Sequence, residues 1–91
     1  PNVVLFKGLH GALILCPEDR FEACLSAMVE ASRAPDARAA KRFAVGGAYA
    51  TKLGPRGALE IPEHLAWYAG LQHELTLQCL GAHCEIVNRA G

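Results

Sequence analysis

The chain has 91 residues, of which 52% are hydrophobic and 20% are charged, and its formal net charge is zero. This composition excludes a disordered chain, because it offers enough apolar surface to bury a core. The apolar runs are shorter than the roughly 20 residues of a membrane-spanning helix, and we expect no signal peptide. The length suits one small domain, or two very small modules that share a core.

The first half predicts a β-hairpin followed by two helices. Residues 2–6 and 12–16 are apolar strands separated by a glycine-containing turn. Pro17 and the two acids after it are typical of a helix start. Asp36 is expected to cap a second helix that runs to Val45 and ends at two glycines. The residues of this helix expected to face inward are Ala37, Ala40, Phe43 and Ala44.

From residue 48 the pattern changes to that of a sheet. Residues 48–53 and 58–61 predict two strands around the turn 54–57, and residues 62–69 predict a short helix. Residues 74–80 and 84–88 predict a second pair of strands around a turn at 81–83. Trp67 is expected in the core and Tyr68 at an interface. The other residues expected to be buried here are Ile61, Leu65, Leu71, Leu75, Leu77 and Ile86.

The charges are segregated along the chain although they cancel. Residues 33–56 carry six basic residues against Asp36 alone, and the flanking segments are acidic. A basic central segment indicates a surface that binds a polyanion, but a solvated helix face beside a charged turn gives the same pattern. Charge alone favours the second interpretation. The basic residues are Arg33, Arg38, Lys41, Arg42, Lys52 and Arg56.

Cysteines and histidines give no pattern of a metal site or a catalytic site. No Cys-x-x-Cys pair occurs, so the cysteines predict mostly buried thiols in a reducing compartment such as the cytoplasm. His73 and His83 lie near Cys79 and Cys84, but the spacing is not that of a zinc site. The sequence contains no nucleophile elbow and no phosphate loop. We therefore expect no enzyme, cofactor, metal or small-molecule substrate. The cysteines are Cys16, Cys24, Cys79 and Cys84.

Several stretches, in order along the chain, resemble the MraZ family of bacterial transcriptional regulators, which contain two AbrB-like modules. Residues 57–71 resemble the family's strand that ends in Ile-Pro, with the helix after it that ends in Ala-Gly-Leu. Residues 84–87, Cys-Glu-Ile-Val, are similar to the closing strand. Residues 11–17 resemble the last strand of the first module and the proline that begins its helix. Phe21 stands where the family often has tryptophan, and residues 42–48 resemble the link between modules.

The resemblance implies an α+β fold and a protein that assembles with itself. It places an AbrB-like swapped-hairpin β-barrel module with short helices at residues 48–91. A partial first module, a hairpin plus two helices, would occupy residues 1–47, with its first strands before Pro1. The family implies a homo-oligomer, often a ring, that binds double-stranded DNA at promoter repeats in the cytoplasm, at the nucleoid, with no membrane partner. Strand edges within residues 1–16, which we expect no residue of this chain to cover, also predict self-association.

The chain departs from the family at the turn that faces DNA. The family's Asp-x-x-x-Arg motif falls on Gly54 and Ala58, so both charged groups are absent. An alternative function is therefore an oligomerisation or protein-interaction module of the same fold that does not bind DNA. The residues expected to contact DNA are Lys52 and Arg56 at this turn, helped by Arg38, Lys41 and Arg42 if the second helix faces the same side.

Overall fold

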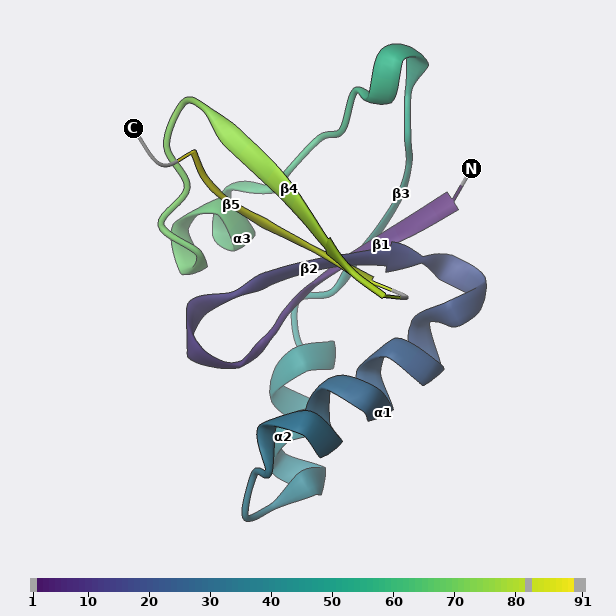
Figure 1. The fold of residues 1–91 in the computed structure, drawn as a ribbon, viewed down its shortest axis with the longest axis vertical. Helices are drawn as coiled ribbons and strands as arrows, with labels where there is room; N and C mark the ends of the chain where they lie inside the picture. Colours follow the sequence, from purple (N-terminus) through teal and green to yellow (C-terminus); the bar gives the residue numbers. More distant parts are fainter. Residues whose placement is uncertain (1, 82, 90–91) are drawn as a thin grey trace.

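One five-stranded antiparallel sheet, drawn from both halves of the chain, forms the centre of the molecule (Figure 1). This computed structural model describes residues 2–81 and 83–89. The strand order is β3-β1-β2-β5-β4. The strands are β1 (Asn2–Lys7), β2 (Leu13–Pro17), β3 (Tyr49–Lys52), β4 (Leu75–Leu80) and β5 (His83–Asn88). The α-helices of the described residues are α1 (Phe21–Ser32), α2 (Ala37–Val45) and α3 (Glu63–Tyr68), and the 3₁₀ turns are η1 (Leu9–Gly11), η2 (Glu18–Arg20) and η3 (Pro55–Gly57).

Strands β1 and β2 are apolar at almost every position because both faces of the sheet are covered. Successive side chains of a strand point to opposite faces, so a strand buried on both sides has no polar alternation. One face packs under α1 and α2 through Val4, Phe6, Ile14 and Cys16. The other face packs against Leu65 of α3 through Val3, Leu5, Leu13 and Leu15.

The first half of the chain confirms most of its predicted elements. Strands β1 and β2 lie where the apolar runs predict them. Asp36 caps α2, and its Oδ1 accepts a hydrogen bond from the Ala39 N–H at 3.1 Å. The helix start predicted at Pro17 is wrong, because Pro17 ends β2 and the 3₁₀ turn η2 precedes α1. A proline with two following acids suits either kind of helical turn, so the sequence does not distinguish them.

The second half corrects four predictions. Residues 58–61 pair with no strand among the described residues, although Gly54 and Ala58 are joined at the turn. Leu77 is 52% exposed on β4, which is the last strand of the sheet and is exposed along its whole length. Leu75 is also exposed, and Trp67 is 84% exposed on the outer side of α3. Leu65 and Ile86 are buried as predicted, and Ile61 and Leu71 are partly buried.

The prediction that no residue of this chain covers the edges of the first two strands is also wrong. β3 pairs with the outer edge of β1, and β5 pairs with β2. The open edges of the sheet, within the described residues, are therefore those of β3 and β4. The pairing of distant segments is non-local, so strand patterns alone do not reveal it. No helix in the described part of the chain has the length and apolar character needed to cross a membrane.

Candidate nucleic-acid interface

The turn after β3 holds Arg56 at its tip. The Gly54 N–H donates to the Ala58 carbonyl oxygen at 2.8 Å, and the Gly57 N–H donates to Gly54 O at 3.2 Å. Arg56 has a φ of 61°, a left-handed conformation that is uncommon outside glycine. Among the described residues its exposed side chain makes no hydrogen bond or ion pair. The turn therefore fixes the backbone position of Arg56, but no described contact fixes the orientation of its guanidinium.

The β1–β2 turn repeats this geometry. The Gly8 N–H donates to Ala12 O at 2.8 Å, and His10 has a φ of 63°. Both turns have the sequence Gly-x-x-Gly-Ala, and the second glycine has a positive φ in each, 80° at Gly11 and 73° at Gly57. His10 therefore occupies the position that corresponds to Arg56. The shared Gly-x-x-Gly-Ala sequence is the signal by which this repeat can be found.

Helix α2 carries the other predicted contacts on its solvent face. Arg38, Lys41 and Arg42 are exposed, while Ala40 and Ala44 are buried against the sheet. Two of the four residues expected to face inward do not. Ala37 and Phe43 are exposed, and Phe43 lies at the surface with its ring 4.3 Å from the Lys7 ammonium.

The two groups of cations lie at opposite ends of the molecule. Figure 1 shows α2 at the lower end and the turn between β3 and α3 at the upper end of the longest axis, along which the chain extends 37 Å. Lys52 ends β3 and leads into that turn. The structure therefore brings Lys52 and Arg56 together, but it does not add Arg38, Lys41 and Arg42 to the same surface of one chain.

A contact missed by the sequence argument ties α3 to the first hairpin. The Tyr68 hydroxyl donates to Gly8 O at 2.5 Å and accepts from the Gly11 N–H at 3.2 Å. The Tyr68 ring also lies 5.6 Å from the Phe43 ring, centre to centre. On the same helix, His64 Nε2 lies 2.9 Å from Gly47 O. Tyr68 thus holds the β1–β2 turn through its hydroxyl and packs its ring on Phe43 of α2.

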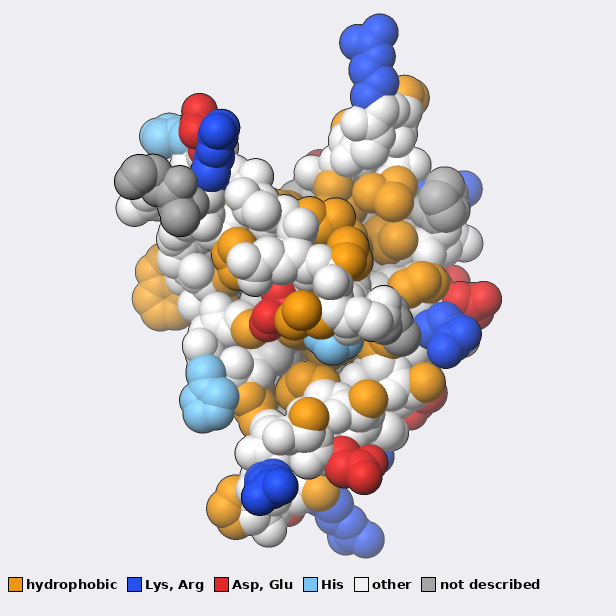
Figure 2. Space-filling model, viewed as in Figure 1, with side chains coloured by type: hydrophobic (Ala, Val, Ile, Leu, Met, Phe, Trp, Pro, Cys, Tyr) orange, Lys and Arg blue, Asp and Glu red, His pale blue; other side chains and the backbone are white. Residues whose placement is uncertain are grey.

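An apolar hollow lies between the edge strand β4 and the segment after β3. Figure 2 shows hydrophobic side chains gathered in the upper half of the molecule, between its two projecting ends. The hollow has a volume of about 370 Å³. Contiguous exposed apolar surface is a candidate interaction site. Its lining includes Leu15, Leu53, Leu59, Ile61, Leu77 and Ile86.

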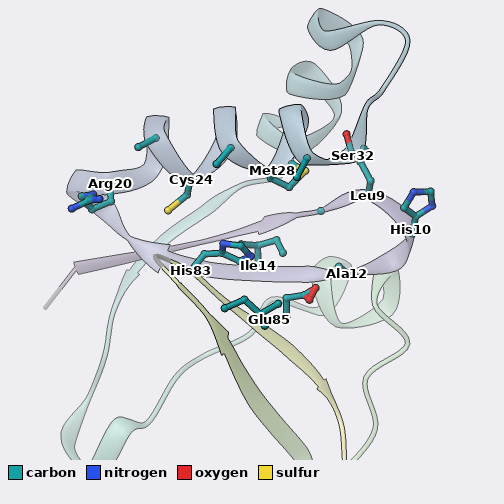
Figure 3. Close-up of a pocket in the computed structure, with 15 residues that line it drawn as sticks. Leu9, His10, Ala12, Ile14, Arg20, Cys24, Met28, Ser32, His83 and Glu85 are labelled. Atoms are coloured by element: carbon teal, nitrogen blue, oxygen red, sulfur yellow. The ribbon is translucent and has the colours of Figure 1, made fainter.

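A second cavity, of about 620 Å³, lies between α1 and the sheet (Figure 3). Arg20 lines it from η2, Cys24 and Met28 line it from α1, and His83 and Glu85 line it from β5. Among the described residues, the side chains of Arg20, His83 and Glu85 make no hydrogen bond or ion pair with one another.

The cysteines fall into two pairs. Cys16 and Cys24 are buried as predicted, at 1% and 3% exposure. Burial, together with the neighbouring Cys24, raises the pKa of the Cys16 thiol to about 12. Cys79 and Cys84 instead form a disulfide, which corrects the prediction of thiols. The register places them directly opposite each other on β4 and β5. The turn predicted at 81–83 includes Ala82, which lies outside the described residues.

The structure defines an α+β domain in which two β-hairpins and a further strand share one sheet. No family model matches the chain. A transcriptional regulator MraZ from Heliobacterium modesticaldum is 36% identical to it over 89 residues. The match covers 94% of this chain, and the chain spans 61% of the length of that relative. The chain belongs to the MraZ family, which is a family of transcriptional regulators.

Proposed function

We propose that the chain is part of a self-associating, DNA-binding transcriptional regulator that works in the cytoplasm, at the nucleoid. The similarity to a MraZ protein along nearly the whole chain carries this proposal. Lys52 and Arg56 contact phosphates from the turn after β3. Both are exposed, and Arg56 makes no competing side-chain interaction among the described residues. Arg38, Lys41 and Arg42 form a second, separate group of phosphate contacts.

Our proposal for the organisation of the chain is a partial first AbrB-like module at residues 1–47 and a second AbrB-like module at residues 48–91. The hairpin β1–β2 meets the hairpin β5–β4 through the antiparallel pair of β2 and β5. The two hairpins are therefore related by an approximate twofold axis. Outside the first hairpin lies β3, and the corresponding position outside β4 has no strand among the described residues. This pairing of two hairpins in one sheet supports a swapped-hairpin module.

Self-association is proposed to occur through β4, with a second copy of the chain as the partner. Unpaired strand edges accept strands from other molecules. Leu77 faces solvent beside this edge at 52% exposure and also lines the apolar hollow. Sedimentation should therefore show a dimer or larger assembly, and Leu77→Lys should shift it to monomer. Gln78→Lys is the matched control, because residue 78 follows on the same strand and faces the opposite side. A wild-type monomer at high concentration would contradict the proposal.

The test of DNA binding is a salt titration with a repeat-containing promoter and with random DNA. Binding should be weak and largely independent of sequence, because base readout needs a positioned donor, and the family's arginine position is Ala58. The variant Lys52→Ala/Arg56→Ala should lower the salt slope by about two units, one for each phosphate contact. Arg20→Ala, at an exposed cation of another element, should leave the slope unchanged. Strong selectivity that survives the double substitution would place the DNA surface elsewhere.

A second test of DNA binding restores the charged residues of the family motif. Gly54→Asp with Ala58→Arg should raise the preference for the promoter repeat. The backbone permits this pair, since a Cβ at Gly54 would meet its nearest neighbours at ordinary distances of 3.4 Å and Ala58 is exposed.

The alternative function is an oligomerisation module of the same fold without DNA binding. The missing Asp and Arg and the separation of the two cationic groups favour it. An intact oligomer that shows no binding to either DNA, even at low salt, would establish this alternative in place of the first.

A further inference from the structure

We infer that Cys79 and Cys84 are a redox-responsive pair that fixes the edge hairpin β4–β5. The two residues are directly opposite in the strand register and are joined by a disulfide. Only four residues separate them along the chain, so the bond constrains the hairpin locally and adds little long-range connectivity. A link of this kind can open and close while the rest of the sheet stays paired.

The position of the pair connects it to the apolar hollow. Cys79 and Leu77 point to one face of β4, and Cys84 and Ile86 point to the same face of β5, because alternate residues share a face. Leu77 and Ile86 line the hollow. The disulfide therefore ends the row of side chains that forms one wall of the hollow. Opening it loosens this wall and the outer strand of the sheet.

The two cysteine residues differ in exposure, and we take this difference to set the order of reaction. Cys79 is exposed and Cys84 is partly buried. With glutathione disulfide as oxidant, the Cys79 thiol loses its proton to solvent, and its thiolate attacks one sulfur and expels a glutathione thiolate. The Cys84 thiolate then attacks the Cys79 sulfur of the mixed disulfide and expels the second glutathione. Two protein thiols are thus oxidised, one glutathione disulfide is reduced to two thiols, and the expelled thiolates take up the protons.

The other cysteine pair supplies an internal contrast. Cys16 and Cys24 are almost fully buried between α1 and the sheet. The raised pKa of Cys16 keeps its thiol protonated at neutral pH, and the thiolate is the form that reacts. Reagents that modify Cys79 and Cys84 in the folded chain should therefore leave Cys16 and Cys24 unmodified.

Trapping of the mixed disulfide tests the chemistry without reference to DNA or assembly. The reduced 91-residue chain is incubated with glutathione disulfide and analysed by intact mass and peptide mapping. The wild-type chain should lose two hydrogens as Cys79 and Cys84 pair. Cys84→Ser should accumulate one glutathione on Cys79, and Cys79→Ser should react much more slowly at Cys84. The inference would be overturned if Cys79 and Cys84 remained free thiols in the wild-type chain, or if the disulfide that formed involved Cys16 or Cys24.

The effect on the hairpin is tested by hydrogen exchange and sedimentation, and its consequence for self-association rests on the function proposed above. Reduction should speed amide exchange in β4 and β5 and leave β1 and β2 unchanged. It should also weaken the assembly severalfold, and Cys79→Ala/Cys84→Ala should show the reduced behaviour with or without reductant. Unchanged exchange in β4 and β5 on reduction would overturn the switch. Unchanged assembly with altered exchange would instead overturn self-association through β4.

Discussion

At the scale of single residues, exposure decides which leucines stabilise the fold. Leu65 of α3 is fully buried among side chains from β1 and β2, whereas Leu77 is half-exposed on the edge strand. Both are predicted core positions from sequence, because both occupy apolar positions of regular patterns. The pattern identifies the apolar face of an element but cannot tell whether another element covers that face.

Leu65→Ala is expected to lower the free energy of unfolding by about 2–5 kcal/mol, as do other large-to-small changes in a core. Leu77→Ala should cost less than about 1 kcal/mol in the monomer, since little of its surface is removed from water. Urea denaturation of both variants at a concentration that keeps the chain monomeric checks the difference. Equal losses would mean that β4 is covered in solution even in the monomer.

Tyr68 shows what side-chain contacts add beyond the pattern. The sequence predicts only that Tyr68 lies at an interface, yet its hydroxyl bonds with both sides of the β1–β2 turn. Tyr68→Phe should therefore lower the free energy of unfolding by about 1–3 kcal/mol, because Gly8 O and the Gly11 N–H lose a partner. Tyr49→Phe, which removes one exposed hydrogen bond to Glu60, is the matched control and should cost less in thermal unfolding.

At the scale of elements, the sequence predicts well those helices and strands that depend on residues close together along the chain. The apolar runs of β1 and β2 and the cap at Asp36 depend on neighbouring residues, and the structure confirms them. Residues 58–61 have a strand pattern but no partner strand among the described residues. A strand exists only where another strand pairs with it, so sequence alone overstates this one. The disulfide likewise depends on the register of β4 against β5, which the sequence leaves open.

The turn of residues 54–58 permits a test that separates conformation from charge. Arg56 has a left-handed backbone, which asparagine tolerates and β-branched residues do not. Arg56→Asn should keep the stability of the chain and lower the salt slope of DNA binding by about one unit. Arg56→Val should give the same loss of slope and also destabilise the turn, measurable as a lower melting temperature. An unchanged slope in both would remove Arg56 from the DNA contacts.

At the scale of the whole molecule, the sheet order decides how the candidate contacts are distributed. Because β3 lies outside β1, the turn after β3 projects at one end of the molecule while α2 packs at the other (Figure 1). The sequence places all five candidate DNA contacts in one continuous basic segment, and nothing local indicates that the fold separates them. Strand order comes from pairing between distant segments, so this part of the candidate site could not be predicted.

The separation leads to a prediction about duplex length. The chain extends 37 Å along its longest axis, so a straight duplex needs about 11 base pairs, at about 3.4 Å each, to lie along both cationic groups. On a duplex clearly shorter than this, Arg38→Ala/Lys41→Ala/Arg42→Ala should leave the salt slope unchanged, while Lys52→Ala/Arg56→Ala lowers it. On a longer duplex both variants should lower the slope, and their effects should add, because distant sites act independently. Salt titrations at two duplex lengths measure this directly. If removing the α2 cations lowered the slope equally on the short duplex, the two groups would have to meet on one surface, which would require more than one chain.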